Sequence, residues 1–381
     1  MKFVTVIGAR PQIIKAAALS RAIKQHFKEQ IREIIVHTGQ HYDQNMSQVF
    51  IDELGIPAPD YNLNIGSATH GVQTARMIEG IEQILLKEKP DYLILYGDTN
   101  STLAGAVAAS KIHIPIAHIE AGLRSFNKSM PEEINRIMCD HASTLLFSPT
   151  KTGYENLLRE GFIARQTKPY TADHPGLFHC GDVMYDNSLF FKDLAQKKST
   201  ILKTLSLENT PFILSTIHRD NNTDNPERLT AIFNALLKIA EKDSIKMIIP
   251  LHPRTAKLLP ENLNSNLYNK IKNSPFIRLI PPVSFLDMIL LESSCEMIMT
   301  DSGGVQKEAF FFNKPVIVLR SETEWKEIVD EGCGIIADAS ETKIEEAYEH
   351  FKTMKGTLKF PSLFGDGQAA RFICQTILAN G

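Results

Sequence analysis

Short runs of apolar residues alternate with longer segments whose apolar positions recur at helical spacing. The first run, residues 3–7, predicts a β-strand, and the next segment, residues 12–27, predicts a helix. The same alternation predicts strands at 33–37, 92–96, 116–119 and 145–148, and helices at 47–54, 71–88 and 101–111. A β-α-β series of this kind is typical of a parallel sheet with helices on both faces.

The alternation stops at residues 165–181, a stretch with two prolines and no periodicity, which predicts a linker. It resumes with predicted strands at 212–216, 247–250, 277–280, 297–300 and 316–319, and a Gly-rich turn and a last helix follow residue 363. We therefore expect an α/β protein with an N-terminal domain at 1–175, a second domain at 182–360, and a ligand-binding cleft between them.

Composition narrows the class of protein. A chain of 381 residues exceeds what one hydrophobic core usually organises, in agreement with two domains. With a net charge of -3, we expect no sequence-independent binding to nucleic acid or to an anionic membrane. The 5 cysteines are scattered without a C-x-x-C pair, and no apolar segment approaches the ~20 residues that cross a bilayer. We expect a cytoplasmic protein with reduced thiols.

A candidate anion site follows the first predicted strand. Gly8 allows close backbone approach where the first helix begins, and Arg10 and Lys15 add positive charge to that helix start. The alternative is an ordinary βα turn with a solvated lysine. Two cations at one helix start favour phosphate binding.

Two carboxylates end successive apolar strands. Asp98 closes the strand at 92–96 and Glu120 closes the strand at 116–119. Taken singly, Asp98 fits a helix N-cap and Glu120 fits a buried ion pair; together, on neighbouring strands, they favour an acid–base pair. His118, on the same strand face as Glu120, fits a buried core histidine better than a functional one.

Glu132 and Arg136 lie four residues apart in a segment that starts like a helix, with a proline followed by two acids. From spacing alone, a surface salt bridge is the default interpretation.

The second half carries its own candidate site. His218 and Arg219 close one predicted strand, and the segment 252–254 closes the next. The sharpest signal is a strand that runs into Ser302, Gly303 and Gly304 and then a helix, which presents free N–H groups to an anion. Glu308, a turn further on, is placed to reach a ribose. We expect a nucleoside diphosphate site here.

Several motifs are missing from the sequence. It contains no G-x-x-x-x-G-K-[ST], no dinucleotide fingerprint after the first strand, no H-E-x-x-H, and no convincing cluster of metal ligands. We therefore expect neither a bound nicotinamide cofactor nor a metal.

Taken together, these motifs resemble the non-hydrolysing UDP-N-acetylglucosamine 2-epimerases. Eight motifs occur in order over nearly the whole chain: GARPQIIK at 8–15, HTGQHYD at 37–43, LYGDTNST at 95–102, HIEAGLR at 118–124, PEEINR at 131–136, HR at 218–219, TDSGGVQKEA at 300–309 and GDG at 365–367. The resemblance implies the fold of many glycosyltransferases (GT-B-like): two Rossmann-like domains, with the C-terminal helix crossing back onto the first. It also implies a homodimer and no cofactor.

The resemblance further implies a reaction in which UDP is eliminated to give a 2-acetamidoglucal and then added back with the opposite configuration at carbon 2. It assigns three groups of residues. The catalytic candidates are Asp98, Glu120, Glu132, Arg136 and His218. The UDP-sugar ligands are Arg10, Lys15, Ser302, Gly303, Gly304, Glu308 and Arg320. A possible activating site contains Gln40, His41, Arg76 and His252. Glu132 thereby changes from a surface pair to a catalytic candidate.

The chain departs from the commoner pattern in three places. Residues 220–224 read DNNTD after His218-Arg219, residues 252–255 read HPRT, and Trp325 follows Thr323-Glu324. These variants resemble the branch that acts on UDP-2,3-diacetamido-2,3-dideoxy-glucuronate, so both substrates stay open. Arg254 is the candidate cation for the carboxylate of that substrate. A glycosyltransferase, a hydrolysing epimerase and a nucleotide-sugar sensor are the competing functions.

Overall fold

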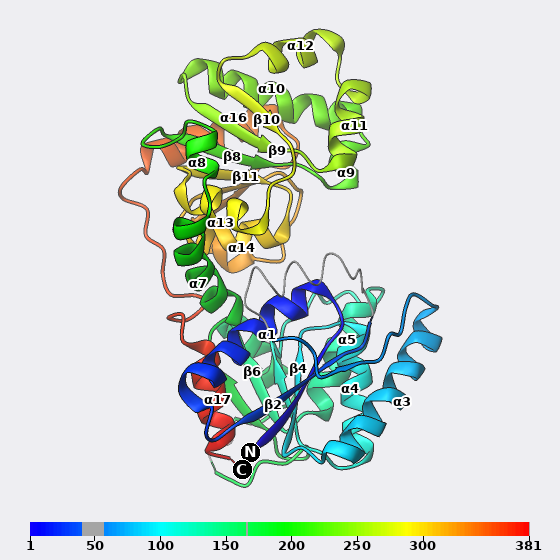
Figure 1. Cartoon of the computed structure of the whole chain (residues 1–381). Helices are drawn as coiled ribbons and strands as arrows, with labels where there is room; N and C mark the ends of the chain where they lie inside the picture. The colour runs from blue at the N-terminus through cyan, green and yellow to red at the C-terminus, as the bar shows by residue number, and fades with distance from the viewer. Residues whose placement is uncertain (40–56, 165–166, 381) are drawn as a thin grey trace. The chain divides into compact units, whose positions relative to one another are not determined.

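The computed structural model describes residues 1–39, 57–164 and 167–380 (Figure 1). These residues form two compact units. Unit 1 comprises Met1–Asn187 and Ser362–Gly381, and unit 2 comprises Ser188–Pro361. The chain passes from unit 1 to unit 2 within helix α7 (Val183–Lys198).

Unit 1 is built on a parallel sheet of seven strands in the order β3-β2-β1-β4-β5-β6-β7. Its strands are β1 (Lys2–Ile7), β2 (Arg32–His37), β3 (Tyr61–Asn62), β4 (Tyr92–Tyr96), β5 (Ile116–Ile119), β6 (Leu145–Ser148) and β7 (Gly176–His179). All residues of β4, β5 and β6 are buried, because helices cover both faces of the sheet.

In unit 1, α1 and α5 begin with a proline in the first turn, and α4 and α6 begin with a threonine cap. They are α1 (Arg10–Ala22), a π-helical turn (Ile23–Phe27), α3 (His70–Glu88), α4 (Asn100–Lys111), α5 (Pro131–Ala142), α6 (Lys151–Arg159) and α17 (Ala369–Leu378). The last helix, α17, packs beside α1 (Figure 1). The carboxylate of Asp186 accepts the backbone N–H groups of Ala369 and Ala370 at 3.1 and 2.8 Å. The predicted return of the C-terminal helix to the first domain is confirmed.

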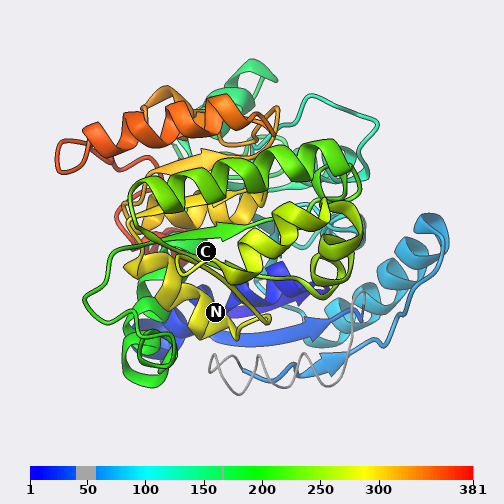
Figure 2. The same ribbon diagram turned by 90° about the horizontal axis from the view of Figure 1, so that it is seen from above.

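Unit 2 is built on a second parallel sheet, in the order β10-β9-β8-β11-β12-β13. Its strands are β8 (Phe212–Thr216), β9 (Lys246–Pro250), β10 (Ile277–Ile280), β11 (Met297–Thr300), β12 (Val316–Val318) and β13 (Gly334–Ile336). Its helices, after α7, are α8 (Ile201–Thr204), α9 (Asp220–Thr223), α10 (Pro226–Lys242), α11 (Pro253–Asn262), α12 (Ser265–Asn273), α13 (Phe285–Ser294), α14 (Gly303–Phe311), α15 (Lys326–Asp330) and α16 (Glu341–Thr353). Helices α10 and α16 lie side by side (Figure 2).

Some sequence-based elements differ from the structure. Part of the predicted linker is wrong: residues 176–179 form β7, the edge strand beside β6. The helix predicted at 12–27 is α-helical only as far as Ala22 and continues as a π-helical turn from Ile23 to Phe27. The predicted helix at 47–54 lies outside the described residues. Among the helices that the structure describes, none has the length and apolar character to cross a membrane.

Candidate active site

The candidate residues of unit 1 gather at the carboxyl edge of its sheet. Strands β1, β4 and β5 are neighbours, with β4 in the middle. The turn after β1 leads into α1 and Lys15, Asp98 follows β4, and Glu120 follows β5. Because parallel strands end at the same edge, topology alone brings these three side chains together.

Lys15 and Glu120 form an ion pair, and each side chain is 13% exposed. A side chain at Gly97 would place its first carbon 3.1 Å from both Glu120 Oε2 and Lys15 Nζ, so this pair would have to shift; the φ of 61° at Gly97 also favours glycine. Burial disfavours the charged form of Lys15, but the carboxylates of Glu120 and Asp98 outweigh it, so its pKa is raised. The ion pair that the sequence analysis considered for Glu120 is therefore present in the structure.

Glu120 also has an unusual backbone. Its φ of 77° lies in the left-handed region, which costs a residue with a side chain about 1 kcal/mol or more. The backbone N–H groups of Glu120 and Ala121 both donate to the carbonyl of Phe147 at 3.0 Å, which holds the chain in this conformation. Strain of this kind is typical of functional positions.

Asp98 contacts Arg136 rather than capping a helix. The N-cap of α4 is Thr99, so the alternative interpretation of Asp98 as an N-cap is wrong. The guanidinium of Arg136 donates to Asp98 Oδ2 and, at 3.0 Å, to Glu133 Oε2. Arg136 thus joins the carboxyl edge of the sheet to helix α5.

Arg136 pairs with Glu133, and the predicted pair with Glu132 is wrong. Glu132 is exposed, whereas Glu133 is 1% exposed and accepts the N–H groups of Ser125 and Phe126, both at 2.9 Å. Helical spacing did not separate the two acids, because positions three and four residues before Arg136 share one face. Burial decided between them, and sequence reasoning missed Glu133.

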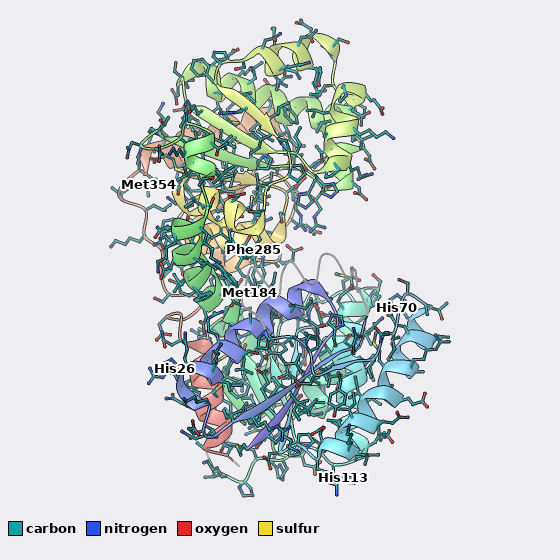
Figure 3. All side chains as sticks on the ribbon, viewed as in Figure 1. His26, His70, His113, Met184, Phe285 and Met354 are labelled. Carbon is teal, nitrogen blue, oxygen red and sulfur yellow. The ribbon has the colours of Figure 1, made fainter. Side chains whose placement is uncertain are left out.

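A polar cluster supports the turn that carries Asp98. Asn135 donates to the carbonyl of Asp98 at 2.9 Å and to Asn100 Oδ1 at 3.3 Å. The amide nitrogen of Asn100 lies 3.1 Å from Nδ1 of His70, the first residue of α3, which is labelled in Figure 3. Asn100 also donates to Gln73 at 3.0 Å. Helices α3, α4 and α5 are therefore linked around Asp98.

In unit 2, a fully buried carboxylate organises the turn that carries His218. Asp301 accepts N–H groups from the backbones of His218 and Arg219 at 3.1 and 3.0 Å, and from the Asn222 side chain at 3.1 Å. His218 Nδ1 lies 3.3 Å from Asp301 Oδ1. Sequence reasoning missed Asp301, although its place at the end of an apolar strand matched that of Asp98 and Glu120.

The turn organised by Asp301 lines a pocket of about 500 Å³. The pocket is formed by His218, Arg219, Asp220, Asn221, Arg320, Ser321 and Glu322. Arg320 donates two hydrogen bonds of 3.0 Å to the carboxylate of Glu324. His218, Arg219 and Arg320 give the pocket the donors that a diphosphate requires.

The Ser-Gly-Gly segment begins helix α14 as the sequence predicts. Ser302 is the N-cap residue, and its side chain makes no capping hydrogen bond to the helix. Burial raises the pKa of Glu308, a turn further along α14, to about 7. Burial beside Glu308 also raises the pKa of Glu292, on helix α13.

The family model described as UDP-N-acetylglucosamine 2-epimerase matches residues 22–378. The chain belongs to this family. It is 48% identical to a UDP-N-acetylglucosamine 2-epimerase homolog of Methanococcus maripaludis, over 99% of each chain. It is 47% identical to the UDP-2,3-diacetamido-2,3-dideoxy-D-glucuronate 2-epimerase of Pseudomonas aeruginosa, over 98% of this chain and 99% of the relative.

Solved structures support the same family assignment. The UDP-GlcNAc 2-epimerase of Methanocaldococcus jannaschii, in complex with UDP-GlcNAc and UDP, is 41% identical, with a TM-score of 0.78 and full coverage of both chains. A Rickettsia africae glycosyltransferase, 15% identical with a TM-score of 0.57, shares the fold alone. The predicted family, the two Rossmann-like α/β units and an epimerase activity are confirmed.

Two of the departures from the commoner pattern of UDP-N-acetylglucosamine 2-epimerases contact each other. Arg254, from the segment HPRT, is 2.7 and 2.6 Å from the two carboxylate oxygens of Asp224 and also pairs with Asp220. Both acids come from the segment DNNTD. Of this ion-pair cluster, Asp220 lines the His218 pocket, and Arg254 contacts the pocket wall through Asp220.

The remaining predicted residues are described only in part. Gln40 and His41 lie outside the described residues. Arg10 is described only as the first residue of helix α1. Arg76 is exposed on α3. His252 is the N-cap of α11, with Nδ1 accepting the N–H of Arg254 at 3.3 Å.

Replacing Glu133 by glutamine is expected to lower the free energy of unfolding by about 2 kcal/mol, because two backbone N–H groups and Arg136 lose a charged acceptor. Burial raises the pKa of Glu133, but the donors from Ser125, Phe126 and Arg136 outweigh it, so the pKa falls below 4.5. The stabilisation is therefore present above pH 4.5 and lost as the pH falls through the lower, folded value.

Urea unfolding of the wild type, Glu133→Gln and Glu132→Gln at neutral and acid pH measures this difference. Glu132→Gln is the matched control and should leave stability unchanged, since Glu132 is exposed. Equal losses in both variants would contradict the assignment.

Proposed function

We propose that this epimerase inverts carbon 2 of a UDP-N-acetylhexosamine, converting UDP-GlcNAc to UDP-ManNAc without hydrolysis. The observation that carries the proposal is the pair of charged contacts at one sheet edge, Lys15 with Glu120 and Arg136 with Asp98. Two carboxylates on adjacent strands are available for proton transfer there. A related epimerase binds UDP-GlcNAc and UDP.

The proposed chemistry explains why carboxylates are needed. Carbon 2 has no adjacent carbonyl, so its proton is not acidic. A carboxylate removes that proton, the electron pair forms the C1–C2 double bond, and the C1–O bond breaks with its electrons leaving on UDP. The same UDP oxygen then adds to C1, and a proton reaches C2 from the opposite face. Inversion therefore needs proton exchange on both faces of the sugar.

Within this proposal, Asp98 and Glu120 exchange the protons, and Glu132 stays a third candidate on α5. Arg136 orients Asp98, which it contacts directly. Lys15 orients Glu120 and supplies positive charge for the phosphates together with Arg10.

Unit 2 holds the UDP in this proposal. The N–H groups at Ser302, Gly303 and Gly304 bind the diphosphate at the start of α14, with Arg320 and His218 from the adjoining pocket. Glu308 accepts from the ribose hydroxyls.

A proton NMR time course with UDP-GlcNAc in D₂O tests the reaction. We expect UDP-ManNAc with deuterium at carbon 2. Asp98→Asn and Glu120→Gln should each lower kcat by about 10²- to 10⁴-fold, because each removes a proton-transfer group. Glu155→Gln, in an exposed pair on α6, is the control and should match the wild type. Free UDP with free N-acetylmannosamine would instead identify a hydrolysing epimerase.

A second candidate substrate is UDP-2,3-diacetamido-2,3-dideoxy-glucuronate. The Pseudomonas aeruginosa enzyme named for it is 47% identical to this chain, against 42% for the UDP-N-acetylglucosamine 2-epimerase of Methanocaldococcus jannaschii. This substrate adds a carboxylate, and Arg254 beside the His218 pocket is the cation proposed to bind it.

Comparing both substrates with the wild type and Arg254→Ala separates the candidates. If Arg254 binds the substrate carboxylate, kcat/KM for the diacetamido-glucuronate substrate should fall about tenfold or more, as expected for a lost charged hydrogen bond, while UDP-GlcNAc is unaffected. Arg159→Ala, on α6, is the control. Equal losses on both substrates would mean that Arg254 acts only by holding α9 through Asp220 and Asp224.

We also propose a homodimer that uses an apolar stripe along helix α5 and its N-cap residue, Met130. Met130, Ile134 and Met138 recur every fourth residue and are 39%, 36% and 47% exposed. Light scattering should give twice the chain mass of 42.7 kDa for the wild type, and the mass of one chain for Met138→Lys. Ile163→Lys, at an exposed residue after α6, is the control and should stay dimeric. A monomeric wild type would contradict the proposal.

A further inference from the structure

His118 is fully buried between two hydrogen-bond acceptors, Asp140 and the Gly97 carbonyl. Its Nδ1 is 2.6 Å from Asp140 Oδ1, and its Nε2 is 2.8 Å from the carbonyl oxygen of Gly97. A carboxylate and a backbone carbonyl both accept and do not donate. With Asp140 ionised beside Arg124, this arrangement requires a hydrogen on both ring nitrogens, which makes His118 an imidazolium cation.

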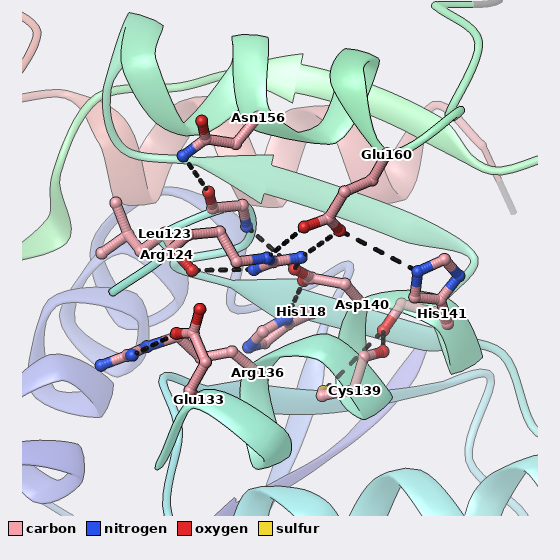
Figure 4. Close-up of polar contacts among 12 residues, drawn as sticks. His118, Leu123, Arg124, Glu133, Arg136, Cys139, Asp140, His141, Asn156 and Glu160 are labelled. Atoms are coloured by element: carbon pink, nitrogen blue, oxygen red, sulfur yellow. Dashed lines mark hydrogen bonds and ion pairs between the residues drawn. The ribbon is translucent and has the colours of Figure 1, made fainter. Parts of the chain in front are cut away.

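A cationic His118 balances the charges of the carboxylates linked to it. Arg124 is 2.7 Å from Asp140 Oδ2 and 2.6 Å from Glu160 Oε1, so one arginine serves two carboxylates (Figure 4). A protonated His118 supplies the second positive charge, and buried charges persist when they are paired in this way.

The groups that face His118 support the same charge state. Cys139 and Asp140 face it from α5, and Gly97 faces it from the turn after β4. Burial alone would lower the pKa of His118, but Cys139 and Asp140 outweigh burial and raise it well above 6.5.

Asp140 holds the chain on both sides of Glu120. It binds His118, two residues before Glu120, and its Oδ2 accepts the N–H of Gly122, two residues after, at 3.1 Å. The strained left-handed backbone of Glu120 therefore lies between two residues tied to one buried carboxylate. His118 holds Gly97 as well, the residue directly before Asp98.

We propose that the His118 imidazolium and Asp140 form a positioning pair that fixes both proton-transfer carboxylates, Asp98 through the Gly97 carbonyl and Glu120 through its strained backbone. The catalytic consequence rests on the proposed epimerisation, whereas the charge state of His118 does not.

Two substitutions of His118 separate its two hydrogen bonds. The amide nitrogen of asparagine lies near the position of Nδ1, and that of glutamine lies near the position of Nε2. His118→Asn keeps the donor to Asp140 and loses the donor to Gly97, whereas His118→Gln does the reverse.

If His118 positions Asp98 through Gly97, His118→Asn should lower kcat about 10- to 100-fold, as for other residues that orient an active group, with KM little changed. His118→Gln should recover most of that loss, because it keeps the donor to Gly97 and leaves Asp140 bound to Gly122 and Arg124. His141→Gln is the control, because His141 is 53% exposed and lies 3.9 Å from Glu160 at the outer end of the network. If kcat fell equally in both His118 variants, and in proportion to a fall in melting temperature, His118 would have only a structural role. That result would overturn the proposal.

A second measurement is independent of turnover. Nitrogen NMR of ¹⁵N-histidine-labelled protein at about pH 7.5, above the ordinary histidine value, should show two N–H protons on His118. A single ring proton there would overturn the proposal whatever the activity. If both protons are present but no UDP-sugar reacts, only the proposed function fails.

The raised pKa of His118 also determines the direction in which stability changes with pH. Because the pKa of His118 is raised in the folded protein, its stabilisation is fully present below 6.5 and is lost as the pH rises through the folded value. The alkaline loss of stability should therefore be smaller in His118→Gln than in the wild type.

Discussion

The carboxylate of Asp140 is the contact on which the unit 1 site depends. It is fully buried and has three donors, from His118, Gly122 and Arg124. Breaking a buried charge network on one side costs about 3–5 kcal/mol, so these donors are held tightly. Asp301 has the same function in unit 2, where its donors come from the turn after β8. Each unit thus fixes a turn at the carboxyl edge of its sheet with a buried acid.

This arrangement assigns different tasks to different carboxylates. Asp140 and Asp301 are fully buried, whereas the side chains of Asp98 and Glu120 are 27% and 13% exposed. A carboxylate that is completely enclosed by donors is poorly suited to exchange protons with a ligand. The two buried acids therefore set the geometry of the turns, and in the proposed reaction the partly exposed Asp98 and Glu120 exchange the protons.

The parallel α/β architecture was predictable because strands that are buried on both faces are almost wholly apolar, as in β4 and in β11 up to Thr300. Strand β7 was not predictable, because it is defined by its pairing with β6 and not by an apolar pattern of its own. Asp98 and Glu120 were predictable as polar ends of apolar strands. Glu133, Asp140 and Asp301 were not identified, because their partners are backbone N–H groups and side chains that only the folded chain brings near them.

The left-handed backbone of Glu120 has a consequence for how this chain would change over generations. Glycine adopts that conformation without strain, so the position is held by a residue that the local backbone disfavours. If the proposed proton-transfer role of Glu120 were no longer under selection, drift to glycine or asparagine would relieve the backbone strain but would leave the mostly buried Lys15 without its Glu120 partner. A descendant that only binds nucleotide sugars would therefore be expected to change Glu120 and Lys15 together.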